Sequence, residues 1–538
     1  MSNRVCTAFA AVITTLLIIT SSRLSQANDP NHFSEVKLGP APGQVYGIAR
    51  SPDNRHIALI TVKDGKWPVI VVDGNSGPQF DGIAKTLVFS PDSNRVAYAA
   101  QKGEKWYMVF DKKIEAAGYD DISSFIFSPD SKRTAYAARN GNKWTVTIDS
   151  QTGIEYDNIR PGLLFFSPDS KRTAYIAEKG IKKMVVIDGQ PGAGYDDISS
   201  FIFSPDSNHM AYVGRKATKR QAIVDGKTVW ECNDIREGSL VFSPDSKHIA
   251  YESRQGIKWQ VVVDGKAKPE YDGIVKDSFI FSPDSKRTAY AIKNNYKQMV
   301  VVDNNVGAEY DLIGQGTPAF SPDSRHMVYW AKKNEKWQVV IDGNSTAEYD
   351  DVRRDAPVFS SDGSHLAYIV RNGGKWQVVV DGKAGSEYDE IMEKSPVFNS
   401  DGTHIVYAAR NGVKWQVIID DRPGPEYDEI KKGIPFFSPD GKHIVYAAKK
   451  GNMWQVIFDD KAGPEYDEIL DDTPVFSPDS KHTAYTSRKT LKWQIIIDGR
   501  AGSEFEGIVC PTTTTISGDG FETIVISKGE LGRVFWKP

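Results

Sequence analysis

The chain has 538 residues, of which 40 % are hydrophobic and 25 % are charged, a balance typical of a folded globular protein. Its 66 basic and 70 acidic residues are well mixed and leave a net charge of −4. This balance gives no reason to expect nucleic acid or an anionic membrane as a partner.

The first 27 residues differ from the rest of the chain. Arg4 precedes an apolar run from Val5 to Ile19, and Ser25-Gln26-Ala27 offers small residues where a signal peptidase cleaves. We predict a secretory signal peptide over residues 1–27. The alternative is an uncleaved membrane anchor, but the strongly apolar part is shorter than the ~20 residues that a span needs. The mature chain is therefore expected to be soluble, without a membrane span, and to work in the periplasm or outside the cell.

Cysteine is rare in this sequence. Cys6 lies in the predicted signal peptide, so that only Cys232 and Cys510 remain in the mature chain. Two cysteines do not make a disulfide framework, although the compartment would permit one. The two could pair, but they lie far apart in the repeats, and we expect two buried free thiols.

An aspartate that follows Ser-Pro, or a close variant of it, recurs at intervals close to 39 residues. These aspartates are Asp53, Asp92, Asp130, Asp169, Asp206, Asp245, Asp284, Asp323, Asp362, Asp401, Asp440, Asp479 and Asp519. So strict a period over nearly the whole chain predicts one supersecondary unit stacked many times. The turn explains the residues, because proline presets φ and aspartate bonds local backbone amides.

The segment 360–398 shows what one repeat contains. Strand-forming runs at 365–370, 375–380, 387–391 and 396–398 are separated by turn residues. Glycine or proline about every ten residues excludes a helical repeat. Four antiparallel strands per unit are the blade of a β-propeller, so we predict an all-β chain of tandem β-propellers.

A resemblance to a known repeat agrees with this interpretation. Residues 127–136, Phe-Ser-Pro-Asp-Ser-Lys-Arg-Thr-Ala-Tyr, followed by Lys143-Trp144 and Ile148-Asp149, resemble the bacterial WD40-like repeat of TolB-type extracytoplasmic propellers. The resemblance covers about residues 45–527 and implies a fold and a compartment rather than an activity. Only residues 28–44 stand where TolB has an α/β domain, so the chain is not TolB itself. We also find neither the G-x-S-x-G motif nor the hydrolase domain of propeller peptidases.

The number of repeats predicts more than one ring. The last unit, 512–536, supplies three strands, and residues 33–38 form an unmatched strand that could complete it and remove an exposed edge. Thirteen blades exceed the usual four to eight of one ring. A proline stands three residues before the serine position only from Pro318 onward. We therefore predict a first propeller of about seven blades over 28–313 and a second of about six over 314–538; if the rings share the termini, six and seven or six and six are alternatives.

Two residue types recur once per repeat. Tryptophan recurs in the run that corresponds to 375–380, where it is expected to pack between neighbouring sheets, with sugar stacking as the alternative. Histidine recurs five residues after the serine position, at His56, His209, His248, His326, His365, His404, His443 and His482. Oligogalacturonate lyases with related repeats use a histidine-bound metal. Here, however, equivalent atoms on neighbouring packed sheets lie ~10 Å apart, which is too far for two histidines to bind one ion. Arginine replaces histidine in other repeats, which indicates a hydrogen-bonding role, so no metal or cofactor is predicted.

Departures from the repeat are the best guide to function. The fifth unit carries the cations Arg215, Lys216, Lys219 and Arg220, and then Trp230; the eighth has Trp330 where most have alanine. Drift in a redundant repeat is the alternative explanation. We predict these six residues as a binding patch of an extracytoplasmic scaffold for protein or peptide partners, without catalysis. The alternative is a lyase or hydrolase acting on a polysaccharide, or a carbohydrate-binding protein, with its site on a propeller face or in a central channel.

Overall fold

The computed structural model describes most of the chain after its N-terminal segment. The described ranges are 33–40, 45–53, 55–63, 66–72, 75–115, 117–353, 357–432, 435–471, 473–508, 513–514 and 520–536. The predicted signal peptide and Cys510 lie outside them. Cys232 is buried and free, as predicted. Within the described ranges, no helix is long and apolar enough to span a membrane.

The described residues form thirteen antiparallel sheets, one per repeat, and no helix, which confirms the predicted all-β fold. We number the sheets 1 to 13 in chain order. They are β2–β5 (45–76), β6–β9 (82–114), β10–β13 (121–152), β14–β17 (158–191), β18–β21 (197–232), β22–β26 (234–267), β27–β31 (273–306), β32–β36 (312–345), β37–β41 (351–384), β42–β46 (390–423), β47–β51 (429–462), β52–β56 (468–505) and β57–β60 (507–536) with β1 (Phe33–Pro40).

Two long strands form the centre of every sheet and pair as a tight hairpin. The second strands are β3 (Ile57–Lys63), β7 (Val96–Lys102), β11 (Thr134–Asn140), β15 (Thr173–Lys179), β19 (Met210–Lys216), β24 (Ile249–Gln255), β29 (Thr288–Asn294), β34 (Met327–Lys333), β39 (Leu366–Asn372), β44 (Ile405–Asn411), β49 (Ile444–Lys450), β54 (Thr483–Lys489) and β59 (Phe521–Ser527). The third strands are β4 (Lys66–Val72), β8 (Lys105–Phe110), β12 (Lys143–Ile148), β16 (Lys182–Ile187), β20 (Lys219–Val224), β25 (Lys258–Val263), β30 (Lys297–Val302), β35 (Lys336–Ile341), β40 (Lys375–Val380), β45 (Lys414–Ile419), β50 (Met453–Phe458), β55 (Lys492–Ile497) and β60 (Glu530–Trp536).

The inner strand corrects one detail of the predicted repeat. The segments predicted as third and fourth strands are two halves of one interrupted inner strand, which belongs to the next sheet. Thus β42 (Glu390–Ile391) and β43 (Val397–Phe398) both pair with β44. The outer strand is instead the short β41 (Lys383–Ala384). Pro396 stands immediately before β43, where a missing backbone N–H costs no ladder hydrogen bond, so the proline fits the gap.

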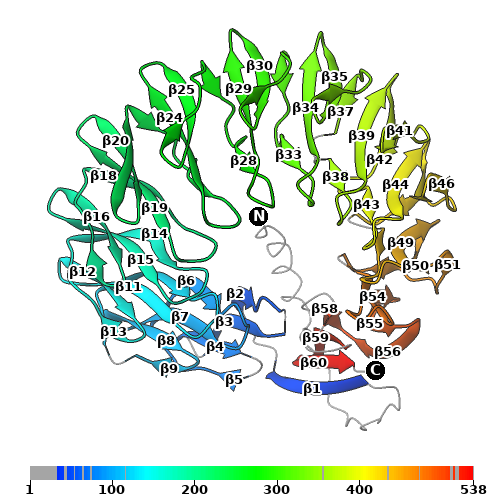
Figure 1. Cartoon of the computed structure of the whole chain (residues 1–538). Helices are drawn as coiled ribbons and strands as arrows, with labels where there is room; N and C mark the ends of the chain where they lie inside the picture. The colour runs from blue at the N-terminus through cyan, green and yellow to red at the C-terminus, as the bar shows by residue number, and fades with distance from the viewer. Residues whose placement is uncertain are drawn as a thin grey trace. The chain divides into compact units, whose positions relative to one another are not determined.

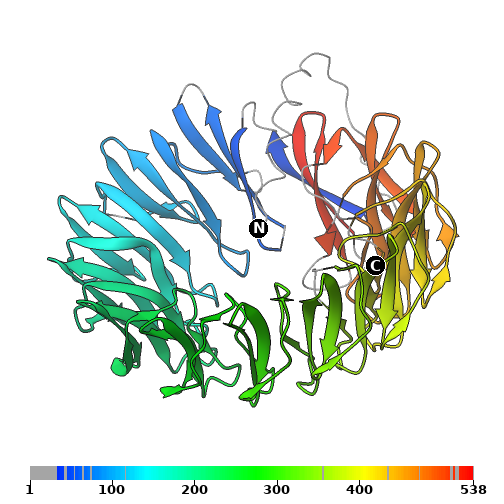
Figure 2. The ribbon, with the colours of Figure 1, turned by 90° about the horizontal axis from the view of Figure 1, so that it is seen from above.

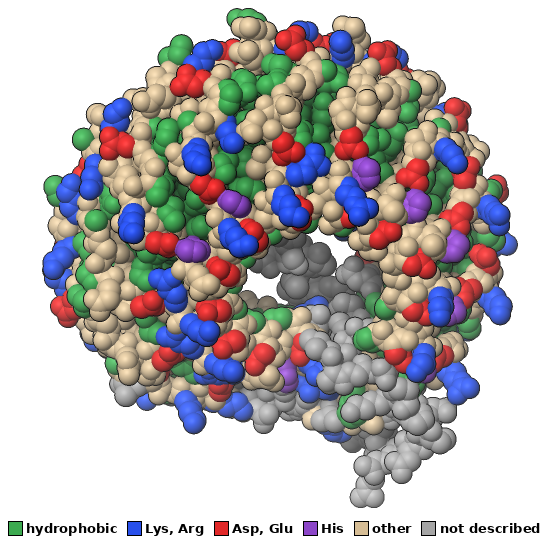
Figure 3. Space-filling view, viewed as in Figure 1, with side chains coloured by type: hydrophobic (Ala, Val, Ile, Leu, Met, Phe, Trp, Pro, Cys, Tyr) green, Lys and Arg blue, Asp and Glu red, His purple; other side chains and the backbone are tan. Residues whose placement is uncertain are grey.

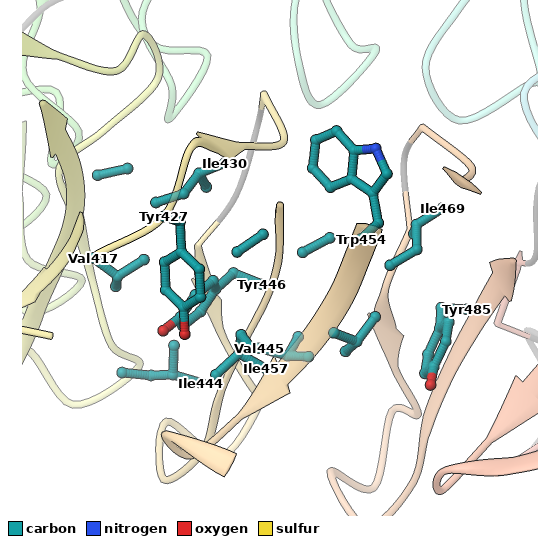
Figure 4. Close-up of a cluster of buried hydrophobic side chains, with 14 of the residues drawn as sticks. Val417, Tyr427, Ile430, Ile444, Val445, Tyr446, Trp454, Ile457, Ile469 and Tyr485 are labelled. Atoms are coloured by element: carbon teal, nitrogen blue, oxygen red, sulfur yellow. The ribbon is translucent and has the colours of Figure 1, made fainter. Parts of the chain in front are cut away.

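The hydrophobic core lies between consecutive sheets. On β44, Val406 and Ala408 pack toward sheet 11, and Tyr407 and Ala409 pack toward sheet 9. Because both faces of the sheet are covered, the strand is apolar at every position from Ile405 to Ala409 instead of alternating. Figure 4 shows one such core, in which tyrosine and tryptophan rings and branched aliphatic side chains fill the space between sheets 10, 11 and 12.

The Ser-Pro-Asp turns link one sheet to the next. In sheet 7, the Ser282 hydroxyl donates to Asp284 at 2.6 Å, and the Asp284 amide donates to the hydroxyl of Ser324 in sheet 8 at 2.9 Å. The hydrogen bond from Ser282 is the main reason that the pKa of Asp284 is lowered. The turns therefore have the structural role that the repetition predicted.

The described chain divides into two compact units. Residues 1–119, 491–495 and 501–538 form the first unit, and residues 120–490 and 496–500 form the second. In the second unit the sheets lie side by side in chain order, as Figure 1 and Figure 2 show from two directions. The predicted boundary between residues 313 and 314 lies inside this unit, where sheets 7 and 8 share a core that contains Ile313, Ala289 and Tyr329. The division into seven and six blades stays a prediction about folding.

In the first unit, strands from both ends of the chain complete one sheet, as predicted. β1 pairs with β60 over seven residue pairs from Phe33↔Trp536 to Pro40↔Glu530. The completed sheet packs on sheet 1, where Ile57 and Leu59 meet Ile524 and Leu531.

Candidate partner-binding surface

The hairpins between the second and third strands of sheets 4 to 7 carry exposed apolar residues at their tips. Ile181 of sheet 4 is 88 % exposed, Ile257 of sheet 6 is 86 % exposed and Tyr296 of sheet 7 is fully exposed at 103 %. The same hairpin position in sheets 10 and 12 carries Val413 and Leu491, which are 80 % and 79 % exposed. What distinguishes sheets 4, 6 and 7 is that their apolar tips lie on either side of the basic hairpin of sheet 5. We call Ile181, Ile257, Tyr296 and the hairpin 215–220 of sheet 5 the tip surface.

Adjacent packing of the four sheets places these tips along one edge of the second unit. One shared core joins sheets 4 and 5 through Ile176 and Ile223, and another joins sheets 5 and 6 through Val213 and Tyr251. A third, around Val261, joins sheets 6 and 7. Because each tip is the end of a hairpin in these sheets, the four tips follow one another in the same order.

The predicted cations come together in the hairpin of sheet 5. Arg215 and Lys216 end β19 and are exposed, and Lys219 and Arg220 begin β20. The Lys216 ammonium lies 4.9 Å from the centre of the Tyr195 ring, and Arg215 donates to the carbonyl of Ala217 at 3.3 Å. Both residues are therefore held in place without the loss of their charge.

Lys219 departs from the pattern of its neighbours. The equivalent lysines of sheets 4 and 7 pair with an aspartate at 2.5 Å, as Lys182–Asp196 and Lys297–Asp311. In the repeat of Lys219, the place of this aspartate is occupied by Asn233. Its side-chain oxygen accepts a hydrogen bond from the backbone amide of Gly256 at 3.0 Å. Among the described residues no carboxylate pairs with Lys219. The substitution of asparagine for aspartate thus leaves a positive charge at the tip surface that sheets 3, 4 and 6 to 10 neutralise.

The other predicted binding residues are placed differently. The Arg220 guanidinium pairs with Asp234 at 2.9 Å, so its charge is largely neutralised. Trp230 is half-buried in the core between sheets 5 and 6, and its indole N–H donates to the Ser253 hydroxyl at 3.0 Å. Trp330 is 0 % exposed and packs in the core between sheets 8 and 9. Trp330 therefore departs from the repeat for a packing reason, and its place in a binding patch stays a prediction.

The opposite ends of the sheets carry the repeated histidines, and those from His209 to His482 each pair with an aspartate. His365 Nδ1 lies 2.7 Å from Asp381 Oδ2, and the other Asp381 oxygen accepts the amide of Leu366. In sheet 3 the guanidinium of Arg133 makes the same contact with Asp149 at 2.8 Å. The interchange of histidine with arginine is thereby explained, and the predicted hydrogen-bonding role is confirmed. Figure 3 shows the histidines interspersed with acidic and basic side chains on the viewed face.

The acidic ends of the inner strands are also neutralised by nearby cations, as expected. Glu390 pairs with Arg410 at 2.8 Å, and Glu468 pairs with Arg488 at 2.7 Å. Among the described residues, no carboxylate forms an ion pair with Arg215, whereas the arginines at its place in sheets 10 and 12, Arg410 and Arg488, are paired.

The repeated tryptophans are covered by cations. The Trp259 ring lies 4.7 Å from the guanidinium carbon of Arg236 and 5.5 Å from that of Arg254. Lys431 and Lys449 cover the Trp454 ring in the same way. Rings covered in this way are not available for stacking on a sugar, so the predicted packing role is favoured over carbohydrate binding.

One buried carboxyl gives a pH-dependent contribution to stability. Glu252 is 3 % exposed and lies 2.9 Å from the Arg236 guanidinium. Burial raises the pKa of Glu252 to about 7 from its ordinary 4.5, although Arg236 opposes the rise. Since the folded state holds this proton more tightly than the unfolded state, the stabilisation is complete below pH 4.5 and is lost as the pH rises through 7.

Replacement of Glu252 by glutamine should therefore flatten the pH dependence. Between pH 4.5 and 8, the fall in the free energy of unfolding should be about 3 kcal/mol smaller in Glu252→Gln than in the wild type. Urea unfolding at several pH values measures this difference. Glu237→Gln, which changes an exposed glutamate close by, should leave the slope unaltered. Equal slopes in the wild type and Glu252→Gln would contradict the assignment.

The topology defines a β-propeller, built from repeated four-stranded antiparallel sheets. No family model matches the sequence, and no curated protein is similar to it in sequence. Among solved structures, TolB from Acinetobacter baumannii is similar at 16 % identity, with 54 % of this chain and 78 % of that chain covered and a TM-score of 0.21. The β-propeller domain of the Trilobed protease from Pyrococcus furiosus is similar at 16 % identity, with 50 % and 96 % covered and a TM-score of 0.24. A eukaryotic initiation factor is similar at 16 % identity, with 64 % of this chain and 95 % of that chain covered and a TM-score of 0.31.

Proposed function

We propose that this protein is a non-catalytic scaffold that binds an acidic protein or peptide through the tip surface. The observation that carries the proposal is the exposure of Ile181, Ile257 and Tyr296 on both sides of a hairpin that bears unneutralised cations. Tyrosine and arginine are enriched at interface hot spots, and Tyr296 and Arg215 belong to this surface. The predicted signal peptide and the TolB-type repeat support a location outside the cytoplasm, which is part of the proposal.

The partner is expected to be acidic because the charges around sheet 5 are unequal. Asp197, which lies opposite Arg215 in the ladder, and its neighbour Asp196 are already paired with Lys183 and Lys182 at 2.8 and 2.5 Å. Arg215 and Lys219 are therefore free to attract negative charge. Such exposed charges increase the association rate and make binding sensitive to salt.

The proposal is tested by charge reversal at the tip surface. In Lys216→Glu/Lys219→Glu we expect normal folding, since exposed charges contribute roughly 0–1 kcal/mol. Affinity for a partner identified by crosslinking on the extracytoplasmic fraction should fall about tenfold or more, and its salt dependence should become weaker. Ile257→Ser/Tyr296→Asn should weaken binding without altering the salt dependence; asparagine suits the positive φ of Tyr296.

A matched control reverses the same number of charges at the opposite ends of neighbouring sheets. Lys171 and Lys247 are exposed and lie in the Ser-Pro-Asp turns of sheets 4 and 6. Lys171→Glu/Lys247→Glu should bind as the wild type does. If all variants bind equally, the tip surface is ordinary solvated surface. Recovery of polysaccharide alone would instead favour the carbohydrate-binding alternative.

A further inference from the structure

A cavity of about 250 Å³ opens in the second unit, at the gaps of the interrupted inner strands of sheets 9 and 10. Its wall includes Arg353 from the gap between β37 (Asp351–Val352) and β38 (Val358–Phe359). Lys394 and Pro396 come from the gap between β42 and β43, and Ile369 comes from β39. Two cations thus face a space whose remaining wall is largely apolar.

The guanidinium of Arg353 is held in place but not neutralised. It donates to the carbonyl of Ile391 at 2.5 Å and lies 5.3 Å from the centre of the Trp376 ring. Neither contact supplies negative charge. Among the described residues, no carboxylate pairs with Arg353 or with Lys394.

The same position three repeats earlier shows what is missing. Arg236 likewise donates to the carbonyl of Ile274, at 3.1 Å, and lies over Trp259. In addition it binds the Glu252 carboxylate at 2.9 Å. The residue at the place of Glu252 in sheet 9 is Ile369, and the residue at the place of Asp277 is Lys394. Two acidic residues have therefore been replaced by an apolar and a basic one.

A third arginine in this position supports the comparison. Arg160 of sheet 4 donates to the carbonyl of Ile198 at 2.9 Å and lies 3.5 Å from Asp197. Of these three equivalent arginines, two have a carboxylate from the chain itself, and Arg353 has none among the described residues. A partly buried arginine without a counterion lowers the stability of the folded state unless a bound group provides the negative charge.

We propose that this cavity binds a carboxylate group, which takes the place that Glu252 has beside Arg236. The cavity is smaller than pockets for drug-sized ligands, so it admits a small organic acid or one acidic side chain of a peptide. Arg353 would bind the carboxylate through its fork of N–H groups, and Lys394 would add a second charge. This site is independent of the tip surface, so either proposal can fail alone.

Calorimetric titration of the whole protein at low ionic strength tests the proposal. The probes are succinate, the peptide acetyl-Gly-Asp-Gly-amide, inorganic phosphate and the neutral succinamide. We expect succinate or the peptide to bind and succinamide not to bind, and the tighter of the two identifies the source of the carboxylate. If neither succinate nor the peptide binds at concentrations up to about 10 mM, the proposal is overturned. A dissociation constant of that size corresponds to a binding free energy of about 3 kcal/mol. Binding of phosphate alone also overturns the proposal.

Variants then locate the site. Arg353→Gln and Lys394→Asp should each weaken binding about tenfold, the effect of losing one charged hydrogen bond. Ile369→Glu places a carboxylate where sheet 6 has Glu252, and it should abolish ligand binding. Ile369→Gln, which adds no charge, should retain part of the affinity. Lys276→Gln, in the equivalent gap of sheet 7, should have no effect. Unchanged affinity in both Arg353→Gln and Lys394→Asp overturns the site, even if Ile369→Glu fails to fold.

Asp351 and Asp355 each lie two residues from Arg353 in sequence. Asp351 pairs with Arg371 at 3.2 Å, so Asp355 is the one that requires its own control. Asp355→Asn should bind as tightly as the wild type or more tightly. Binding that arises only in Asp355→Asn would mean that the chain supplies its own counterion, and it would overturn the proposal.

Discussion

Removal of β1 is expected to cause the largest loss of stability in the first unit. Without residues 33–40, the seven residue pairs with β60 are lost, and β60 becomes an open edge. At about 1 kcal/mol for each net hydrogen bond, the loss is on the order of 5 kcal/mol. Hydrogen exchange of β59 and β60 in a chain that begins at residue 41 should show faster exchange, and the protein should aggregate through the open edge.

Side-chain changes on β1 provide the control for this truncation. Glu35 and Lys37 have exposed side chains, and Lys37 pairs with Glu530 at 2.7 Å. Glu35→Ala/Lys37→Ala keeps the backbone ladder, so exchange in β60 should stay close to that of the wild type. Equal protection of β60 in the truncated and complete chains would show that β1 is not needed to complete this sheet.

The repeat could be predicted from sequence because its signals are local. The Ser-Pro-Asp turn, the Asn-Gly hairpin and the tyrosine and alanine of the second strand each specify structure within a few residues. The pairing of β1 with β60 was also predictable, because an unmatched strand and an incomplete unit stood at opposite ends. The order of strands was not predictable, since a short segment such as 387–391 is equally compatible with a whole strand and with half of one.

The candidate site was only partly predictable. The cations of residues 215–220 were found because they break the repeat, and their place on one hairpin follows from the turn. The exposure of Ile257 and Tyr296 depends on which residue occupies the tip, and apolar residues there resemble those of the adjoining strands. The cavity beside Arg353 was missed, because it depends on Ile369 and Lys394, which lie in other strands of the fold.

Trp330 illustrates why a departure from the repeat need not mark a binding site. The backbone amide of Gly314 donates to the carbonyl of Trp330 at 2.9 Å, and a Cβ added at Gly314 would lie 2.8 Å from the Trp330 Cβ. At the matching places in sheet 10 stand Met392 and Ala408, with the same hydrogen bond at 2.8 Å. A large side chain therefore faces a small one in both sheets, with the order reversed. The indole of Trp330 thus depends on the small residue at position 314, a dependence that the sequence of one repeat does not reveal.

This pairing bears on the predicted boundary between residues 313 and 314. Gly314 was at the proposed junction of two rings, but it is also where the large indole of sheet 8 requires a residue without a side chain. Gly314 thus has a packing reason that is independent of a linker, and Gly316 adopts a positive φ of 77°. A cut between Gly314 and Gly316 that leaves two folded fragments would still support the predicted division.

Simultaneous replacement of Gly314 and Trp330 should be tolerated, although replacement of either residue alone should destabilise the protein. Trp330→Ala should lower the free energy of unfolding by about 3–5 kcal/mol, because it empties a fully buried site. Gly314→Met should also destabilise, since its side chain would collide with the indole. The double variant Gly314→Met/Trp330→Ala reproduces the pair of sheet 10 and should regain most of the stability, a non-additivity expected of residues in contact.

Urea unfolding of the four proteins measures this coupling, and partner binding measures the role of Trp330. The double variant should bind any partner of the tip surface as the wild type does, because Trp330 is fully buried in the core between sheets 8 and 9. Additive effects of the two single changes would contradict the packing argument. Loss of binding in a stably folded double variant would support the predicted place of Trp330 in the binding patch.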